Sequence, residues 1–337
     1  MRKDVTKAIR DLAELDRGVR DYHAASRRPT TWTSYNLAWQ RFVNFCAPKD
    51  AWKATAEDVA RWCVFLTGKG LSPSTISGNL SGLKFYYEQL GKGYFQGRSG
   101  VATRKSPTDD DLVRRVLKGI RRRNARPAVR KAPLLLDSIE KMMDAQPDNL
   151  RGLRNRAMLS LAWASCRRAS EIYGLNVEHR GDGWLEFDDN GLVVVLRRSK
   201  SNQEYRIEER YGVPARPSAP RYCPVRLVKE WIAQAGLTRG PVFPSVLRNG
   251  RPRRTRIQYG GLHHFVKLAA KQIGLDPLSI STHSLRSGCI TWLYLEGVHP
   301  ERIREHSGHK DLQTLFHYIR PFKRSSSSPL NEIRWAR

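Results

Sequence analysis

The sequence has few acidic residues for its number of basic ones, and it has no long apolar segment. Its 337 residues include 32 Asp and Glu against 60 Lys and Arg, which gives a formal net charge of +28. Solubility does not require such an imbalance, so the charge indicates a polyanionic partner. The longest apolar runs, at residues 62–66 and 192–196, fall far short of the ~20 residues needed to cross a bilayer. We therefore expect no membrane partner.

Cysteine is scarce and scattered, with five positions and no Cys-x-x-Cys pair: Cys46, Cys63, Cys166, Cys223 and Cys289. This usage predicts reduced thiols in a cytoplasm rather than a disulfide framework or a zinc site. The polar residues that follow Met1 do not resemble a signal peptide, which favours the same compartment. His306 and His309 lie three positions apart, but no third ligand is evident near them. We expect no metal site and no cofactor.

The composition is that of an ordered globular protein. Nine Trp, twelve Tyr and an apolar fraction of 40% argue against a histone-like or ribosomal basic protein, which is the main alternative for so basic a chain. The length is sufficient for about two domains with cores of their own. We interpret residues 1–29 as a charged arm that precedes the first domain.

Residues 30–123 have the pattern of a helical domain. Aromatic residues between 32 and 45 recur at helical intervals. Thr55 is suited to cap a second helix, and Ser72-Pro73 is a typical start for a third. Residues 107–110 introduce a fourth helix. We expect most of the apolar residues on these helices to form the core of the domain.

The fourth helix and the segment after it are densely basic. A solvated helix face normally mixes charges of both signs, but here only Asp111 interrupts the cations. We interpret the cations as contacts to phosphates of a nucleic acid. They are Arg114, Arg115, Lys118, Arg121, Arg122, Arg123, Arg126, Arg130 and Lys131. Residues 124–132 have no apolar period and are predicted to link two domains.

Beyond the linker the pattern is mixed. Helices are predicted at residues 137–145, 149–164, 224–235 and 260–273. Residues 183–188 and 192–197 are predicted to form a hairpin around Asp189-Asn190-Gly191, with a third strand at 204–209. A basic loop at 248–256 is a second candidate for phosphate contacts, through Arg251, Arg253 and Arg254.

Near the carboxyl end, three fragments follow one another at compatible spacings. His283 and Arg286 lie three positions apart, so they share a face if the segment is helical. Gly308-His309 follows, and Tyr318 comes nine positions after His309. A guanidinium, two imidazoles and a phenol can hold a phosphodiester and attack it. Taken singly, the His-Arg pair is more often a solvated helix face. Tyr318 could be a core tyrosine, but its polar neighbours His317 and Arg320 are unlike a core position.

The ordered set resembles the signature of the tyrosine recombinase (phage integrase) family. Arg168 begins an Arg-x-Ser-Glu-Ile stretch that is similar to the family's first arginine motif, and Glu171 is expected to orient the site. Arg167 competes for the role of Arg168, and we interpret it as a phosphate contact or salt-bridge partner. Lys200 follows the second strand, where the family carries a catalytic lysine. One departure is Ser307, since the family often has Leu before Gly-His.

The resemblance implies a fold that is mainly α with a small antiparallel β-sheet. It implies a helical core-type DNA-binding domain at 30–123 with a Cre-like layout, and a mixed α/β catalytic domain at 133–324. Together they would form a C-shaped clamp on DNA. The tail, residues 325–337, would dock into a neighbouring subunit.

The implied function is site-specific recombination through a 3′-phosphotyrosine at Tyr318, without metal or ATP. Arg168, Arg286, His283 and His309 would bind the phosphate or move protons, and Lys200 would protonate the leaving 5′ oxygen. The partner would be double-stranded DNA with inverted-repeat half-sites, bound by a homotetramer on two sites that is a monomer or weak dimer without DNA. The alternatives are a type IB topoisomerase and a non-catalytic DNA-binding protein of the same fold.

Overall fold

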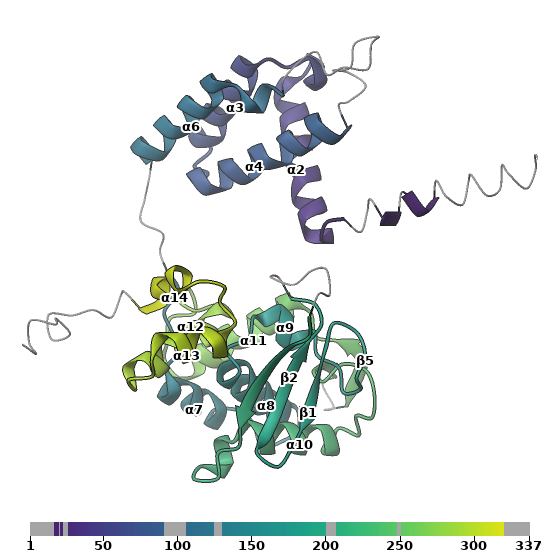
Figure 1. Cartoon of the computed structure of the whole chain (residues 1–337), viewed down its shortest axis with the longest axis vertical. Helices are drawn as coiled ribbons and strands as arrows, with labels where there is room; N and C mark the ends of the chain where they lie inside the picture. Colours follow the sequence, from purple (N-terminus) through teal and green to yellow (C-terminus); the bar gives the residue numbers. More distant parts are fainter. Residues whose placement is uncertain are drawn as a thin grey trace, which may run out of the picture. The chain divides into compact units, whose positions relative to one another are not determined.

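The computed structural model describes residues 17–19, 21–22, 26–90, 106–124, 130–199, 207–247 and 251–319. The chain divides into two compact units, Met1–Ala128 and Val129–Arg337, each with its own hydrophobic core (Figure 1). Within the predicted linker, residues 125–129 lie outside the described residues. The fold class predicted from the sequence, mainly α with a small antiparallel sheet, is confirmed.

The first unit is helical, and its helices begin where the capping residues predict. The Asp58 carboxylate accepts a hydrogen bond from the Thr55 backbone at 2.9 Å, and the Thr55 hydroxyl accepts one from the Asp58 backbone at 3.4 Å. This reciprocal cap satisfies two amides that the first helical turn leaves unpaired. The helices are α2 (Pro29–Cys46), α3 (Ala56–Gly68), α4 (Pro73–Phe85) and α6 (Asp111–Asn124), with short turns η1 (Ala51–Lys53), η2 (Tyr86–Leu90) and η3 (Pro107–Asp109).

Helix α6 contacts the core of this unit through a narrow apolar face. Val113 and Ile120 are buried, whereas Leu112, Val116 and Leu117 are only partly buried against the core. The remaining positions of the helix are mostly charged and exposed. Because the buried face is small, most of the surface of α6 stays free to carry arginine and lysine.

The second unit contains the four helices predicted at 137–145, 149–164, 224–235 and 260–273, as α7, α8, α10 and α11. Asn149 caps α8 by accepting a hydrogen bond from the Gly152 backbone at 3.0 Å. Gly308, with a left-handed φ of +66°, ends α13. The helices are α7 (Leu136–Asp144), α8 (Leu150–Ala164), α9 (Ala169–Tyr173), α10 (Pro224–Gln234), α11 (Tyr259–Gln272), α12 (His283–Leu295), α13 (Pro300–Ser307) and α14 (Leu312–Ile319), with a short turn η4 (Pro220–Tyr222).

The main sheet has three antiparallel strands in the order β1 (Gly183–Phe187), β2 (Gly191–Leu196) and β3 (Glu209–Pro214). The predicted hairpin of the first two strands is correct. The prediction of the third strand at 204–209 is wrong, because β3 begins only at Glu209; residues 204–206 lie outside the described residues. β3 is one of the two edge strands of this sheet, and an edge position tolerates Gly212 and Pro214, which weaken the strand signal in the sequence.

The structure also contains a two-stranded sheet that the sequence pattern did not predict. β4 (Pro244–Val246) and β5 (Pro252–Arg256) pair where the sequence predicted a basic loop at 248–256. Arg253 and Arg254 lie on β5 and are exposed, and Arg251 is exposed just before it. The sequence gives no apolar strand pattern here, because β5 consists entirely of arginine, threonine and proline.

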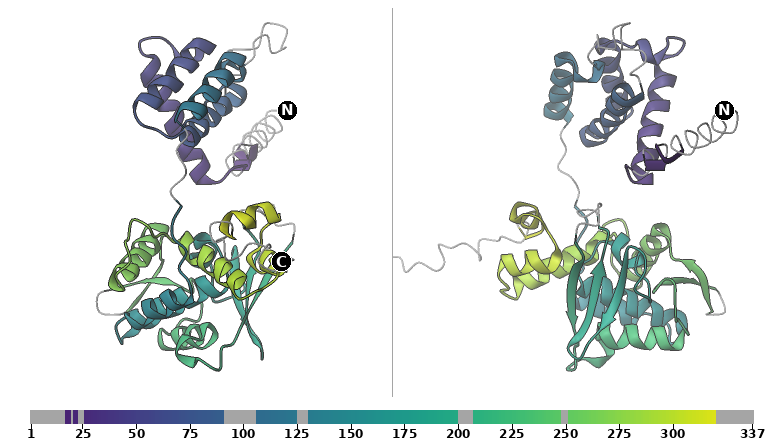
Figure 2. Two further views of the ribbon diagram at one scale, coloured as in Figure 1. Left: turned by 90° about the vertical axis from the view of Figure 1, so that its left-hand side faces the viewer. Right: turned by 45° about the vertical axis from the view of Figure 1, so that its right-hand side comes forward.

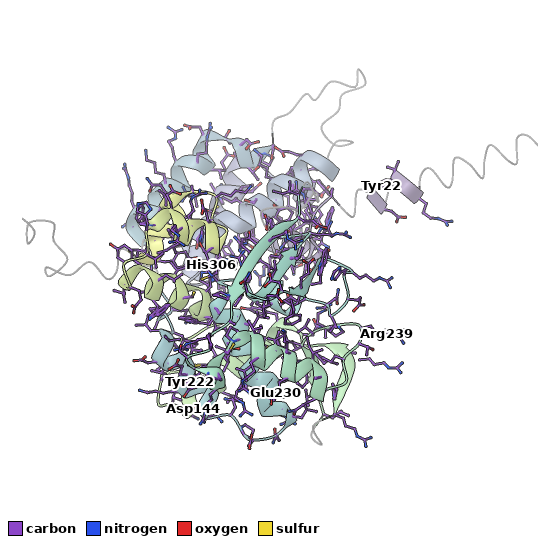
Figure 3. All side chains as sticks on the ribbon, turned by 60° about the horizontal axis from the view of Figure 1, so that its bottom comes forward. Tyr22, Asp144, Tyr222, Glu230, Arg239 and His306 are labelled. Atoms are coloured by element: carbon purple, nitrogen blue, oxygen red, sulfur yellow. The ribbon has the colours of Figure 1, made fainter. Side chains whose placement is uncertain are left out.

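In the second unit the three-stranded sheet lies against helices α8 and α10, and α12, α13 and α14 gather at one end (Figures 1 and 2). Trp231 of α10 is fully buried and donates a hydrogen bond to the Val242 carbonyl at 2.7 Å. Tyr222 and Asp144 lie together on the surface, where the phenol donates to the carboxylate at 2.8 Å (Figure 3). Among the described residues, no helix combines the length and the apolar character that crossing a membrane requires.

The segment that enters the second unit fixes the position of α12. The Leu134 amide donates to the Ser284 carbonyl at 3.0 Å, and the Leu134 carbonyl accepts from the Trp163 indole at 2.8 Å. A Cβ atom on Gly288 would lie 1.8 Å from that carbonyl oxygen. The close approach of this backbone to α12 therefore requires glycine at position 288.

We predict that Gly288→Ala destabilises the second unit by about 1–3 kcal/mol or more, because backbone atoms cannot move aside as a flexible side chain does. Gly260→Ala is the matched control, since a Cβ on this helical glycine meets nothing within 4 Å. Urea unfolding of the full chain, followed by tryptophan fluorescence, measures both variants. Equal stability of the two variants would contradict the packing described here.

Candidate active site

Helix α12 places His283 and Arg286 on neighbouring turns of one face. Arg286 is only 1% exposed, and its Nη1 donates to the Cys166 carbonyl at 2.7 Å. His283 lies at the start of the helix and is exposed. Burial, together with the positive charges of Arg167 and Arg168, lowers the pKa of Arg286. The helix thus presents one buried guanidinium and one accessible imidazole.

His309 packs against the buried guanidinium. Its Nε2 lies 3.1 Å from Arg286 Nη2, and its Nδ1 lies 2.7 Å from the Ser307 hydroxyl. The Ser307 hydroxyl donates to the Arg304 carbonyl at 3.3 Å, so it accepts from Nδ1, which we therefore assign the proton. Nε2 is then the acceptor for Arg286, whose Nη2 lies nearer to it than to Nδ1, at 3.1 against 3.4 Å. Ser307, which the sequence showed only as a departure from the family pattern, therefore orients the imidazole.

The pKa of His309 is lowered to about 3, chiefly by burial and then by the charges of Arg286, Arg168 and Arg167. The imidazole is consequently neutral at physiological pH. This state agrees with the tautomer deduced from its partners, because a doubly protonated ring has no nitrogen left to accept from Arg286.

Tyr318 lies on α14 and faces both histidines. Its hydroxyl is 2.7 Å from His283 Nε2, and its ring centroid is 5.4 Å from that of His309. Leu315 and Ile319 are buried on the same helix and hold it against the core. The half-buried phenol is thereby positioned between an accessible imidazole and the Arg286–His309 pair.

Arg168 and Glu171 form a second anchor of the site. The Glu171 carboxylate, whose side chain is 3% exposed, accepts from the Arg168 guanidinium and from the Arg168 backbone, both at 2.8 Å. The Arg168 side chain is 28% exposed. These two bonds hold Arg168 against Glu171. Arg168 is the more accessible of the two arginines proposed for catalysis.

The prediction for Arg167 as a phosphate contact or salt-bridge partner is wrong. This residue is 3% exposed, and its Nε donates to the Ser165 carbonyl at 2.8 Å. Its guanidinium also donates to the His306 carbonyl and lies 3.4 Å from the centroid of the Tyr211 ring. Arg167 thus joins α13, β3 and the turn before α9. Local sequence carries no signal for this role, because two of its partners, Tyr211 and His306, are distant along the chain.

Two of the predicted site residues, Lys200 and Arg126, lie outside the described residues. The cations on α6 are exposed, although Arg115 pairs with Asp111 at 3.0 Å and Arg121 donates to the Ser77 hydroxyl at 2.9 Å. Arg114 lies 3.7 Å from the same carboxylate. No ion pair or hydrogen bond to a described residue is seen for three others on this helix: Lys118, Arg122 and Arg123.

Two predicted cations at the end of the predicted linker, Arg130 and Lys131, contact the second unit. Arg130 donates to the His317 carbonyl, one residue before Tyr318. Lys131 donates to the Leu278 carbonyl at 2.5 Å. Both residues remain exposed, so these bonds position them beside α14 and the segment before α12.

The sequence is similar to a known family and to characterised recombinases. A sequence model of the phage integrase family covers residues 133–324. An integrase/recombinase XerD homologue from Selenomonas ruminantium is 28% identical over 236 residues, which cover 70% of this chain and 67% of that protein. The recombinase Cre of Escherichia phage P1 is 24% identical over 311 residues, covering 84% of this chain and 83% of that protein.

The fold is also that of a solved recombinase. The crystal structure of the XerH site-specific recombinase bound to palindromic difH substrate superposes with a TM-score of 0.59 at 16% identity, covering 85% of this chain and 75% of that one. The family match spans more than half of the sequence, from the linker to the end of the site. The chain therefore belongs to the phage integrase family, the tyrosine recombinases.

The depressed pKa of His309 predicts a pH-dependent stability. The folded-state pKa of about 3 lies below the ordinary histidine pKa of 6.5, so the unfolded chain takes up the proton first as pH falls. The contribution is complete above the unfolded pKa and is lost as pH falls towards the folded one. Between pH 7 and pH 5 this residue accounts for a loss of about 2 kcal/mol.

We expect the stability of His309→Gln to fall less over this pH range than that of the wild type, by about that amount. Urea unfolding at a series of pH values measures the difference. His317→Gln, an exposed histidine on α14, is the control and should keep the slope of the wild type. An unchanged slope in His309→Gln would contradict the neutral, buried imidazole.

Proposed function

We propose that this protein is a site-specific DNA recombinase in which Tyr318 cuts one DNA strand and holds its 3′ end as a phosphotyrosine. One observation carries the proposal, the 2.7 Å contact between the Tyr318 hydroxyl and His283 Nε2 beside the Arg286–His309 pair. A nucleophile within hydrogen-bond reach of a base, next to fixed cations, is the arrangement that attack on a phosphodiester needs.

In the first step the Tyr318 oxygen attacks the phosphorus, and the phenolic proton passes to His283 Nε2. The bond from phosphorus to the 5′ oxygen breaks as the bond to tyrosine forms. Lys200 would supply the proton to the departing 5′ oxygen, as the family resemblance implies. Rejoining reverses these transfers with a different 5′ hydroxyl. The phosphotyrosine retains the energy of the broken ester, so the reaction needs no ATP.

The phosphate charge would be met by guanidinium groups. Arg168 is accessible and held by Glu171, so it would contact a phosphate oxygen without first being desolvated. Arg286 is nearly fully buried, and a phosphate would reach its guanidinium on the side where His309 now contacts it. Loss of one such fixed donor typically costs ~3–4 kcal/mol of transition-state stabilisation. These cations take the place that metal ions have in other phosphoryl-transfer enzymes.

The DNA would be bound by both units. The exposed cations of α6 and of β5 are suited to phosphates, which set affinity and register but do not read sequence. In this proposal residues 30–123 form the helical DNA-binding domain, 124–132 the linker and 133–324 the catalytic domain. Residues 1–29 would form an arm ahead of them.

The assembly that we propose is a homotetramer on two DNA sites, each with inverted-repeat half-sites, and a monomer or weak dimer without DNA. Four protomers would exchange strands through a Holliday junction. The tail at 325–337, which lies outside the described residues, would dock into a neighbouring protomer. The support is the similarity to Cre along most of both chains. We place the protein in the cytoplasm of a bacterium, encoded by the host, a phage or a mobile element.

Tyr318→Phe removes the attacking oxygen and should abolish covalent attachment to DNA. The assay is a nicked suicide substrate that carries the protein's own recombination site, found as inverted repeats beside its gene. Wild-type protein should form an adduct that survives denaturing gel electrophoresis, and Tyr318→Phe should form none while binding the DNA with unchanged affinity.

Tyr294→Phe is the matched control, since this partly buried tyrosine lies on α12 away from the described contacts of the site. Its adduct should match that of the wild type. An adduct that persists in Tyr318→Phe, or is lost equally in both variants, would rule out Tyr318 as the nucleophile.

Lys118→Ala combined with Arg122→Ala should weaken DNA binding and its salt dependence. The two residues lie one turn apart on α6 and are exposed. Loss of two phosphate contacts should reduce the slope of log K against log salt by about 2. Arg226→Ala with Lys229→Ala removes the same charge from α10 and should leave the slope unchanged. Fluorescence anisotropy over a salt series measures both, and equal slopes would exclude α6 from the interface.

A further inference from the structure

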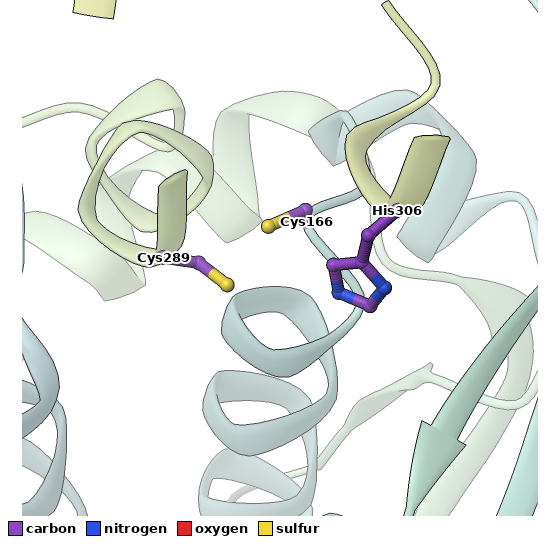
Figure 4. Close-up of side chains that lie close together, drawn as sticks. All are labelled: Cys166, Cys289 and His306. Atoms are coloured by element: carbon purple, nitrogen blue, oxygen red, sulfur yellow. The ribbon is translucent and has the colours of Figure 1, made fainter. Parts of the chain in front are cut away.

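Three potential metal ligands meet beneath the active site. Cys166 lies in the turn between α8 and α9, Cys289 lies on α12 and His306 lies near the end of α13. Their ligand atoms all lie within 4.8 Å of one another, and Figure 4 shows the two sulfur atoms and the imidazole facing a common space. Both cysteines are buried and His306 is half-buried.

The backbone at Cys166 is held in a conformation that favours glycine. Its φ is +53°, and among the described residues it is the one non-glycine residue with a positive φ. Side chains rarely adopt this left-handed region, and such an outlier often marks a functional position. The residue held in this conformation carries one of the three ligand atoms that lie within 4.8 Å of one another.

We propose that Cys166, Cys289 and His306 bind a thiophilic metal ion of the Zn²⁺ class. Two sulfurs and an imidazole are a donor set that selects such ions. In a tetrahedral site with bonds of about 2.0–2.3 Å, ligand atoms lie about 3.5–3.8 Å apart, so small side-chain rotations would complete the site. Three protein ligands leave one coordination position for water or another small ligand.

Backbone carbonyls of the proposed metal ligands accept hydrogen bonds from two arginines, one of them in the candidate active site. The Cys166 carbonyl accepts the hydrogen bond from Arg286, and the His306 carbonyl accepts one from Arg167. Cys289 follows Arg286 by three positions on α12. The metal takes no part in the proposed strand cleavage. Its binding instead restrains the two carbonyls that hold the arginines, and this inference does not depend on the proposed function.

The test uses Co²⁺ as a spectroscopic substitute for Zn²⁺, added to reduced, metal-free full-length protein. Thiolate coordination should give a near-ultraviolet charge-transfer band and the visible bands of tetrahedral Co²⁺, saturating at one ion per chain. Zn²⁺ should displace Co²⁺ and abolish both bands. The absence of the charge-transfer band would overturn the proposal.

Cys166→Gly is the most informative variant, because glycine accommodates the positive φ while the sulfur is removed. It should fold, as judged by its thermal unfolding, and lose the charge-transfer band. Cys289→Ser should lose the band as well. Cys223→Ser is the matched control, since Cys223 is a buried thiol of the same unit, and its spectrum should equal that of the wild type. A band retained in Cys166→Gly and Cys289→Ser would assign the ion to another site.

X-ray absorption of the Zn²⁺-loaded wild type provides a measurement that requires no variant to fold. Two sulfur ligands with nitrogen or oxygen ligands are expected. A shell of nitrogen and oxygen alone would show adventitious binding at surface histidines and carboxylates, and would refute the site.

Discussion

The arrangement of the candidate site in the second unit depends on the buried guanidinium of Arg286. A charge removed from water is costly unless fixed dipoles replace its hydration. Here the Cys166 carbonyl and the His309 imidazole replace it, and they come from positions 120 and 23 residues away. The turn before α9, the end of α13 and the start of α14 must therefore all meet α12. The fold of this end of the molecule is arranged around one cation.

The arrangement also sets the protonation state of the site before any DNA arrives. Burial and the cluster of arginines keep His309 neutral, and Ser307 selects the tautomer whose Nε2 accepts from Arg286. Glu171 is engaged by Arg168, so its charge holds that arginine in place. Donors fixed in this way need no reorganisation when charge develops on a phosphate, which is the physical basis of electrostatic catalysis.

Much of the fold follows from short-range signals. Thr55, Ser72 and Asn149 cap the helices that the sequence predicts, and the Asp188 carboxylate stabilises the hairpin turn by accepting hydrogen bonds from the Asn190 and Gly191 amides at 2.9 and 2.8 Å. Where such signals are weak, the predictions fail. β3 contains glycine and proline, and β5 is almost wholly polar, so both strands are defined by pairing with their neighbours rather than by their own composition.

For the site, the sequence by itself determined which residue types are available and, by their order, the family to which the chain belongs. The sequence identified five candidate site residues because each lies in a short motif that can be recognised without the fold. They are Arg168, His283, Arg286, His309 and Tyr318. Only the tertiary structure decided that Arg167 is buried while Arg168 stays partly exposed. It also brought Cys166 and Cys289 close to His306. These outcomes depend on contacts between segments far apart along the chain, such as Arg167 with His306, 139 positions away, and local pattern does not encode such contacts.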